Sequence, residues 1–222
     1  LTHVYHFYTK RNLWVLAKYF STLSASILRK QLVPILTGGL LGLTRLQRFK
    51  PKTTFPNMIL SGTLYVGSLV REWRADQWLN GKFQTFVHAF SSRRISSAIE
   101  TRSSSLLDAP SASYDYIFAD PPFGGNLMYS ELNFLWESWL KVWTNNKPEA
   151  IENKVQGKGP QEYHRLMTDC FKEACRVLKP GHWMTVEFSN TKASVWNSIQ
   201  TALAEAGFIV ANVSVLDKQQ HT

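Results

Sequence analysis

The stretch that decides the fold is Ile117-Phe118-Ala119-Asp120-Pro121-Pro122-Phe123-Gly124-Gly125. An apolar run over residues 114–119 precedes Asp120, and such a run is typical of a buried β-strand. The two prolines stop the strand, because proline has no backbone N–H for the ladder. The sequence therefore predicts Asp120 at the carboxyl end of a strand, where open α/β sheets bind their ligands.

The second half of the chain alternates strand-like and helix-like segments. We expect strands at residues 114–119, 183–188 and 208–216, and helices at residues 129–143, 161–178 and 193–206. This alternation predicts an α/β fold with a mostly parallel sheet and helices on its faces.

The first half predicts mainly helices. Thr9 is a suitable N-cap for a helix over residues 13–28, and a second helix over residues 32–46 is expected to break near Gly38 and Gly39. Residues 58–70 are β-like and residues 95–101 form a weak strand. A helix over residues 76–90 carries a stripe predicted to face the core, namely Trp78, Leu79, Phe83, Phe86, Val87 and Phe90.

Charge is divided unevenly along the chain, whose net charge is +9 over 222 residues. Residues 1–110 hold 15 Lys+Arg against 4 Asp+Glu, a net of +11, whereas residues 111–222 hold 10 against 12, a net of −2. A basic half beside a nearly neutral half suggests a polyanionic partner, most simply nucleic acid. The alternative is that acidic segments outside this sequence balance the charge. The predicted division is a basic part at 1–110 and a catalytic part at 111–222.

Four basic residues are candidate phosphate contacts. Arg45 and Arg48 precede a proline-marked loop, and Lys154 and Lys158 lie in a glycine-containing loop. For each pair, an ordinary solvated loop is the alternative.

The start of the first helix is a candidate anion site. Lys10 and Arg11 follow Thr9 in the first turn, where the helix dipole disfavours cations. An anion such as a phosphate or a cofactor carboxylate would remove this cost, and two solvated charges are the alternative.

The remaining composition sets the class of protein. Hydrophobic content of 44% and charged content of 18% indicate a globular chain. Cys170 and Cys175 lie five residues apart on a predicted helix, so we expect no joint metal site. The few cysteines fit a reducing cytoplasm, and no signal peptide or membrane span is expected. The chain starts at Leu1 and ends just after a strand-like run, and we expect it to be a piece of a longer protein.

The corner after the predicted strand suits chemistry on an amino group. The Asp120 side chain can accept one N–H bond of an exocyclic amino group, and the Pro121 carbonyl can accept the other. Phe123 can stack on a base, and Gly124 and Gly125 allow the backbone to approach it. Positioned acceptors and an aligned methyl donor would supply the catalysis without a covalent enzyme intermediate. A proline-stopped structural turn is the alternative.

These residues carry a family resemblance. Residues 114–188 resemble the amino-methyltransferases of the DNA adenine-N6/cytosine-N4 class, whose fourth motif is Asp/Asn-Pro-Pro-aromatic. The run Arg176-Val177-Leu178-Lys179-Pro180-Gly181 looks like the turn before strand five of S-adenosylmethionine-dependent methyltransferases. The narrower likeness is to large bacterial and archaeal DNA methylases, through residues 6–13, 61–65 and 120–136.

The resemblance implies a class I, Rossmann-like methyltransferase fold, incomplete at both ends, with S-adenosylmethionine as cofactor. It implies that Asp120, Pro121, Pro122 and Phe123 bind the target amino group and base, and that Asp120 also lies near the cofactor. It also places Ser103 and Ser104 close to the cofactor, in the turn corresponding to the family's third motif. Thr9 and Lys10 are the further candidates for cofactor binding.

One departure from the family matters. The glycine-rich cofactor motif that follows a strand is missing, since residues 36–42 are glycine-rich but lack the acid and the preceding strand. We therefore expect these 222 residues to bind S-adenosylmethionine weakly or not at all.

The sequence predicts a site-specific DNA methyltransferase, with adenine N6 as the first target and cytosine N4 as the second. A base within a duplex cannot reach such a site, so the substrate is a flipped base or a single strand. One alternative is methylation of RNA bases or of a protein amide. The other is a non-catalytic nucleic-acid-binding remnant, because the cofactor motif is absent.

Overall fold

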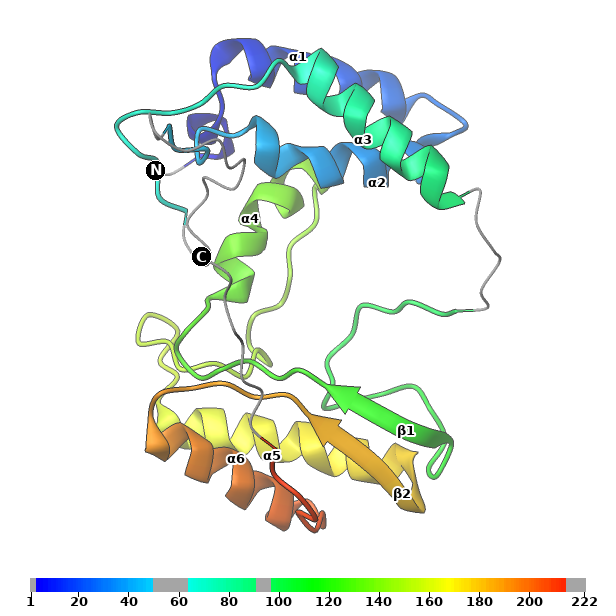
Figure 1. Cartoon of the computed structure of the whole chain (residues 1–222), viewed down its shortest axis with the longest axis vertical. Coiled ribbons are helices and arrows are strands. Elements are labelled where there is room, and N and C mark those ends of the chain that lie inside the picture. The colour runs from blue at the N-terminus through cyan, green and yellow to red at the C-terminus, as the bar shows by residue number, and fades with distance from the viewer. Residues whose placement is uncertain (1–2, 50–63, 91–96, 215–222) are drawn as a thin grey trace. The chain divides into compact units, whose positions relative to one another are not determined.

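The chain forms two compact units in the computed structural model, which describes residues 3–49, 64–90 and 97–214 (Figure 1). Unit 1 comprises Leu1–Ala98 and Tyr129–Thr144, and unit 2 comprises Ile99–Met128 and Asn145–Thr222. The predicted division at residue 110 was based on the distribution of charge along the sequence, whereas these units are defined by how the chain packs. The boundary lies at residue 98, and a short segment between residues 129 and 144 returns to unit 1.

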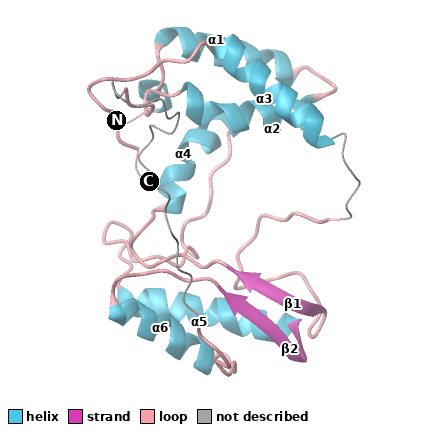
Figure 2. Cartoon of the chain, viewed as in Figure 1, coloured by secondary structure: helices cyan, strands magenta, loops and turns pink. Residues whose placement is uncertain are grey.

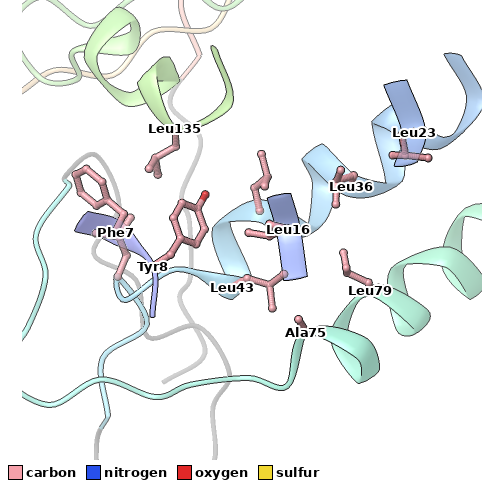
Figure 3. Close-up of a cluster of buried hydrophobic side chains, with 11 residues drawn as sticks. Phe7, Tyr8, Leu16, Leu23, Leu36, Leu43, Ala75, Leu79 and Leu135 are labelled. Carbon is pink, nitrogen blue, oxygen red and sulfur yellow. The ribbon is translucent and has the colours of Figure 1, made fainter. Parts of the chain in front are cut away.

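Unit 1 is helical (Figure 2). Its helices are α1 (Lys10–Ser24), α2 (Arg29–Leu40), α3 (Ala75–Phe90) and α4 (Tyr129–Leu140), with single 3₁₀ turns at Val4–Phe7 and Leu41–Leu43. Their apolar faces meet in one core (Figure 3). The buried side chains of this core are Phe7, Tyr8, Leu16, Leu23, Leu36, Leu40, Leu43, Leu46, Ala75, Leu79 and Leu135.

The start of α1 agrees with the sequence. Thr9 is its N-cap, and the Thr9 hydroxyl accepts a hydrogen bond from the Asn12 backbone N–H at 3.3 Å. Buried Asn12 donates to the carbonyls of Leu43 and Trp73, each at 3.2 Å. These bonds tie α1 to two distant segments of unit 1, because a buried amide must find partners.

The predicted break of the second helix near Gly38 and Gly39 is wrong. Helix α2 continues through both glycines to Leu40. The Trp78 indole N–H of α3 donates to the Gly39 carbonyl at 2.9 Å, and side chains of α3 lie directly against Gly39 and Gly42. Gly39 and Gly42 therefore allow α3 to pack closely, and neither Gly38 nor Gly39 ends α2.

Helix α4 lies in unit 1, although it directly follows the candidate site in sequence. Leu135 is in the core of unit 1, and the Trp136 indole donates to the Thr37 carbonyl at 3.0 Å. The Trp139 indole donates to the Tyr8 hydroxyl at 3.2 Å. The apolar stripe predicted for this helix thus serves unit 1, and Trp143 lies beyond its end with 78% of its surface exposed.

The stripe predicted for α3 faces the core only in part. Leu79 is buried and Trp78 is half-buried, but Phe83 and Val87 are 42% and 48% exposed. Phe86 is half-buried. The residues of α3 in the core cluster come from its amino-terminal half. The side chain of Phe90 lies outside the described residues.

Unit 2 contains a parallel β-α-β arrangement. Strand β1 (Tyr114–Ala119) pairs with β2 (Leu178–Val186), and helix α5 (Pro160–Val177) connects to β2 directly. Helix α6 (Ala193–Glu205) packs on α5. This confirms the mixed α/β class. Strand β2 begins five residues before the prediction and includes Lys179, Pro180 and Gly181, next to an irregularity in pairing.

The expectation of helices on both faces of a larger sheet is not met in the described part of the chain. Its sheet has two strands, and Met184 and Val186 pack against the α5–α6 core on one face. On the other face, Tyr116 and Phe118 of β1 are 53% and 60% exposed, and Trp183 of β2 is 67% exposed. Strand β1 has the predicted bounds but is not buried on both sides.

Three other predicted strands are not found where the structure describes them. Residues 64–70, 97–101 and 208–214 form no strand, and residue 70 makes one isolated bridge to Arg48. An extended segment becomes a strand only when it finds a neighbour, which β-propensity alone does not provide. The rest of these predictions, at residues 58–63, 95–96 and 215–216, lies outside the described residues.

Alanine substitutions at two glycines should act in opposite directions. A methyl group at Gly42 would overlap the Trp78 indole, so Gly42→Ala should destabilise unit 1 by roughly 1–3 kcal/mol. Exposed Gly38 lies within α2 with no atom within 4 Å of an added methyl group. Gly38→Ala should stabilise by about 0.5–1 kcal/mol through helix propensity. Urea unfolding followed by circular dichroism measures both, and equal effects would contradict the packing of Trp78 on Gly42.

Candidate functional site

The corner after β1 is held by hydrogen bonds from three separate segments. The Tyr163 hydroxyl of α5 donates to the Pro122 carbonyl at 2.8 Å, and the Asn190 side-chain amide donates to the Phe123 carbonyl at 2.9 Å. The Glu152 backbone N–H donates to the Gly124 carbonyl at 3.3 Å. Three successive carbonyls are thus fixed, and the path of the chain after Asp120 is determined by its surroundings.

Phe123 extends this fixed corner into a row of aromatic rings. Its ring meets Phe188 edge to face at 5.4 Å, and Phe188 meets Trp196 in the same way at 5.1 Å. The Trp196 indole donates to the Asn190 carbonyl at 2.8 Å. Phe123 is half-buried and anchors the corner, and its stacking on a base stays a prediction.

The two glycines of the motif approach the protein itself. Gly124 has a φ of +65°, and a Cβ there would lie 3.3 Å from a methyl carbon of Val195. A Cβ at Gly125 would lie 3.1 Å from the Glu152 carbonyl oxygen. Both glycines therefore have a packing role that only glycine fills without strain, and their approach to a substrate stays a prediction.

A cavity of about 540 Å³ opens beside the corner. Asp120, Pro121, Pro122 and Ser104 line it, and its other walls are mainly apolar side chains of β1 and α5. Asp120 is exposed, so its carboxylate is accessible. The structure therefore brings together four of the residues that the sequence singled out.

Ser103 is not on the wall of this cavity. Its hydroxyl is 2.8 Å from the Ser105 hydroxyl, and it accepts a hydrogen bond from the Ser105 backbone N–H at 3.4 Å. Ser103 thus shapes the turn that presents Ser104.

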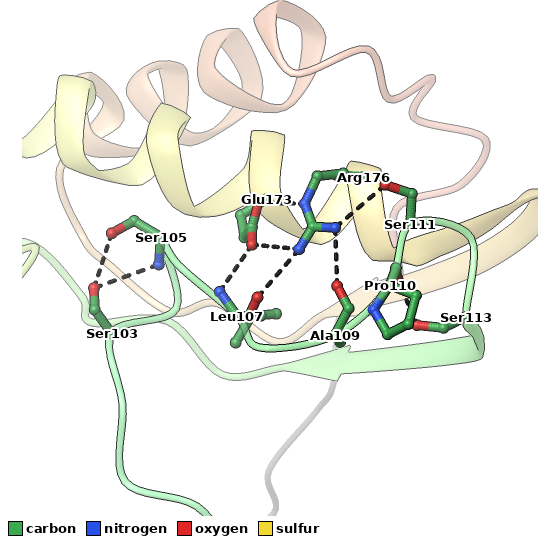
Figure 4. A network of polar contacts seen from close by, with 9 residues as sticks. All are labelled: Ser103, Ser105, Leu107, Ala109, Pro110, Ser111, Ser113, Glu173 and Arg176. Carbon is green, nitrogen blue, oxygen red and sulfur yellow. Dashed lines mark hydrogen bonds and ion pairs between the residues drawn. The ribbon is translucent and has the colours of Figure 1, made fainter.

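An ion pair that sequence reasoning missed holds this loop in place (Figure 4). The Arg176 guanidinium donates to the carbonyls of Ala109 and Leu107 at 2.9 and 3.2 Å, and it pairs with Glu173 at 2.7 Å. A Glu173 carboxylate oxygen accepts the Leu107 backbone N–H at 2.8 Å. These contacts lower the pKa of Glu173 to about 2, chiefly through the hydrogen bond from Arg176. The three-residue spacing of the two charges on a helix was the available signal.

The charges at the start of α1 have a partner within unit 1. The Thr9 hydroxyl donates to Glu72 at 2.6 Å, and the Arg11 guanidinium pairs with Glu72 at 3.0 Å. Glu72 supplies an anion at this helix start, which the sequence alone did not identify. Lys10 is exposed. Thr9 and Lys10 belong to unit 1 and Asp120 to unit 2, so their shared cofactor site stays a prediction.

Lys158 does not offer its charge to a nucleic acid, which corrects the prediction. Its side chain is 7% exposed, and its ammonium group donates to the carbonyls of Asn146 and Glu149 at 2.6 and 2.7 Å. Burial lowers the pKa of this lysine. The buried ammonium group therefore ties Lys158 to the backbone of residues 146–149. The sequence spacing between Lys154 and Lys158 gave no sign of this role.

The other candidate phosphate contacts have different surroundings. Lys154 is exposed at a turn in which the Asn153 side chain accepts the backbone N–H groups of Val155 and Gln156. Arg45 and Arg48 are half-buried in unit 1, and the Arg45 guanidinium donates to the His6 carbonyl at 3.3 Å. Contact with phosphate stays a prediction for these three residues.

Three further features of the described residues concern a thiol, metal binding and a smaller cavity. Burial raises the pKa of the cavity-lining Cys170 thiol to about 11, which disfavours the nucleophilic thiolate. Among the described residues, no three His, Cys or acidic side chains gather as a metal site, and no helix is long and apolar enough to cross a membrane. A smaller cavity of about 210 Å³ lies between α1, α2 and α3, and none of the predicted site residues lines it.

Comparison of the chain with protein-family models gives no match, and comparisons with curated proteins and with solved structures give none either. The family resemblance therefore rests on the quoted motifs alone, and function is argued from the geometry of the site.

Acid should loosen the loop that carries Ser104. The pKa of Glu173 falls from its ordinary value of 4.5 to about 2 on folding, so the carboxylate stabilises the fold above pH 4.5. That contribution is lost as the pH falls from 4.5 towards 2. Glu173→Gln should lower the stability at neutral pH and make stability depend less on pH between 4.5 and 2. Urea unfolding midpoints measured at several pH values in this range and at neutral pH test both effects.

Glu162→Gln is the matched control for this acid effect. Glu162 also pairs with an arginine three residues away on α5, but the pair holds no loop backbone. We expect a smaller change than for Glu173→Gln. If the stability of Glu173→Gln depends on pH as that of the wild type does, the Glu173–Arg176 pair does not support the loop of residues 103–113.

Tyr163→Phe should weaken the corner after β1. The change removes only the hydroxyl that donates to the Pro122 carbonyl, and the lost bond should cost about 0.5–1.5 kcal/mol. Urea unfolding measures this cost. Tyr19→Phe, at a side chain that is 46% exposed, is the control and should have little effect. Equal stability of both variants would exclude a supporting role for Tyr163.

Proposed function

We propose that this chain carries the catalytic corner of an S-adenosylmethionine-dependent DNA methyltransferase that modifies the amino group of adenine (N6) or cytosine (N4). The supporting observation is the exposed Asp120 at the carboxyl end of a parallel strand, next to Pro121 and Pro122 on the wall of a cavity of about 540 Å³. This volume lies within the range of small-molecule sites.

Asp120 and Pro121 are the acceptors that the substrate needs. The Asp120 carboxylate accepts one N–H of the amino group, and the Pro121 carbonyl accepts the other. The next three carbonyls along the corner are engaged by Tyr163, Asn190 and the backbone of residue 152. Holding both N–H bonds favours a more tetrahedral nitrogen, whose lone pair then becomes available for attack.

The cavity suits part of the cofactor. Ile117, Met167 and Phe171 offer apolar surface for a flat ring, and the Ser104 hydroxyl and Asp120 carboxylate offer polar contacts. When bound, S-adenosylmethionine supplies a methyl group on a positively charged sulfur. A nearby carboxylate such as Asp120 favours that charge. The glycine-rich residues 36–42 are helical or in a 3₁₀ turn, so they form no loop of the kind that cradles a cofactor.

DNA is the proposed substrate because of the charge on unit 1. The sequence of this unit holds 15 Lys+Arg against 4 Asp+Glu, whereas unit 2 holds 10 against 12. A polyanion is attracted to such a surface. An exocyclic amino group is buried in the stack of a duplex, so the base must be flipped out or lie in a single strand.

Two alternatives keep the same residues. A non-catalytic nucleic-acid-binding protein would also use the charge of unit 1, but it would not require an accessible carboxylate beside a rigid double proline. RNA-base or protein-amide methylation would use the corner in the same way on a different amino group. The identity of the methylated product separates these possibilities.

Asp120→Ala should abolish methylation by the polypeptide that carries this sequence. Asp120 is exposed, so its loss should remove an acceptor without unfolding the protein. The assay measures transfer of a labelled methyl group from S-adenosylmethionine to DNA, with digestion to nucleosides to identify the modified base. Asp108→Ala, a change at an exposed acid of the same unit, should retain activity. Label in RNA or protein, or full activity of Asp120→Ala, would refute the proposal.

A further inference from the structure

Helix α1 presents a tryptophan at the centre of its solvent face. Trp14 is 70% exposed, whereas Asn12, Leu16 and Leu23 of the same helix are buried. Each residue rotates the helix by about 100°, so positions two and nine residues away from Trp14 lie on the opposite side. The largest aromatic side chain of α1 therefore points directly away from the core of unit 1.

Exposed lysines flank this tryptophan along the helix. Lys10 and Lys18 are four residues before and after Trp14, a spacing that places them on the same face. They lie about 6 Å from it along the helix axis on either side. Helix α1 contains no acidic residue, and its other cation, Arg11, pairs with Glu72. Lys10, Trp14 and Lys18 define the outer face of α1.

We propose that the outer face of α1 binds single-stranded nucleic acid. The Trp14 indole stacks on an unpaired base, and the ammonium groups of Lys10 and Lys18 contact the phosphates on either side. Stacked bases combined with a positively charged track are the usual basis of single-strand binding. Charge complementarity supports this partner, because unit 1 carries a net charge of +11.

Two other partners fit this face less well. In a duplex the bases stack on one another, so an indole reaches a base face only after two neighbouring bases have been unstacked, which costs free energy. A membrane-binding helix needs a wide apolar face, and the apolar side of α1 is already used in the core of unit 1. The proposal does not depend on methyl transfer, since it requires neither Asp120 nor the cavity of unit 2.

Binding of a fluorescein-labelled oligothymidylate of about 15 nucleotides to the whole 222-residue chain tests the proposal by fluorescence anisotropy. Trp14→Leu should weaken binding roughly tenfold, because it removes stacking and keeps an apolar side chain. Trp14→Phe should restore most of the affinity. The double change Lys10→Gln and Lys18→Gln should lower the slope of log affinity against log salt by about 1.4.

Trp183→Leu is the matched control, because Trp183 is 67% exposed but lies in the nearly neutral unit 2. It should leave affinity unchanged. Thymine has no exocyclic amino group for Asp120 to hold, so failure of the proposed catalysis would not affect this result. The proposal is overturned by absence of binding, by equal affinity of wild type and Trp14→Leu, or by a duplex that binds more tightly and independently of Trp14. Tighter association with anionic vesicles than with the oligonucleotide would also overturn it.

Discussion

The fixed backbone after β1 is the constraint on which the candidate site depends. Proline cannot continue a strand ladder, so the chain must turn after Asp120, and the protein engages the carbonyls of Pro122, Phe123 and Gly124. Tyr163 holds one, Asn190 holds the next, and the backbone at Glu152 holds the third. Without these bonds the double proline would still end the strand, but the direction of Asp120 would be undefined.

Helix α5 supports the site at three levels. Tyr163 near its start holds the corner, Met167 and Phe171 in its middle form the cavity wall, and Glu173 and Arg176 at its end hold the loop that presents Ser104. Tyr163, Met167 and Phe171 recur every four residues and share one side of α5, whereas Glu173 and Arg176 lie on another side, where they contact the loop of residues 103–113. One amphipathic helix therefore connects residues that are far apart in sequence, and a change in its packing would alter the whole cavity.

The two compact units differ in charge as well as in architecture. Unit 1 is strongly basic and helical, and unit 2 is nearly neutral and contains the sheet. The chain leaves unit 2 after Met128, adds α4 to the core of unit 1, and returns at Asn145. The segment immediately after the candidate site is thus part of the basic unit. The chain therefore passes from unit 2 to unit 1 only a few residues after Phe123 in the sequence.

Local patterns in the sequence determined β1, α3, α5 and α6 within a few residues, because periodicity and chain-breaking residues act over short distances. They also identified Asp120, Pro121, Pro122 and Ser104, which share one cavity. Only the tertiary structure decided that α4 belongs to unit 1, that Gly39 and Gly42 accommodate Trp78, and that Lys158 is buried. It likewise decided that Glu72 meets Arg11, and that Glu173 and Arg176 hold a loop more than 60 residues earlier in the chain. The reason is that packing partners and hydrogen-bond acceptors come from distant segments, and composition and spacing carry no information about which segments will meet.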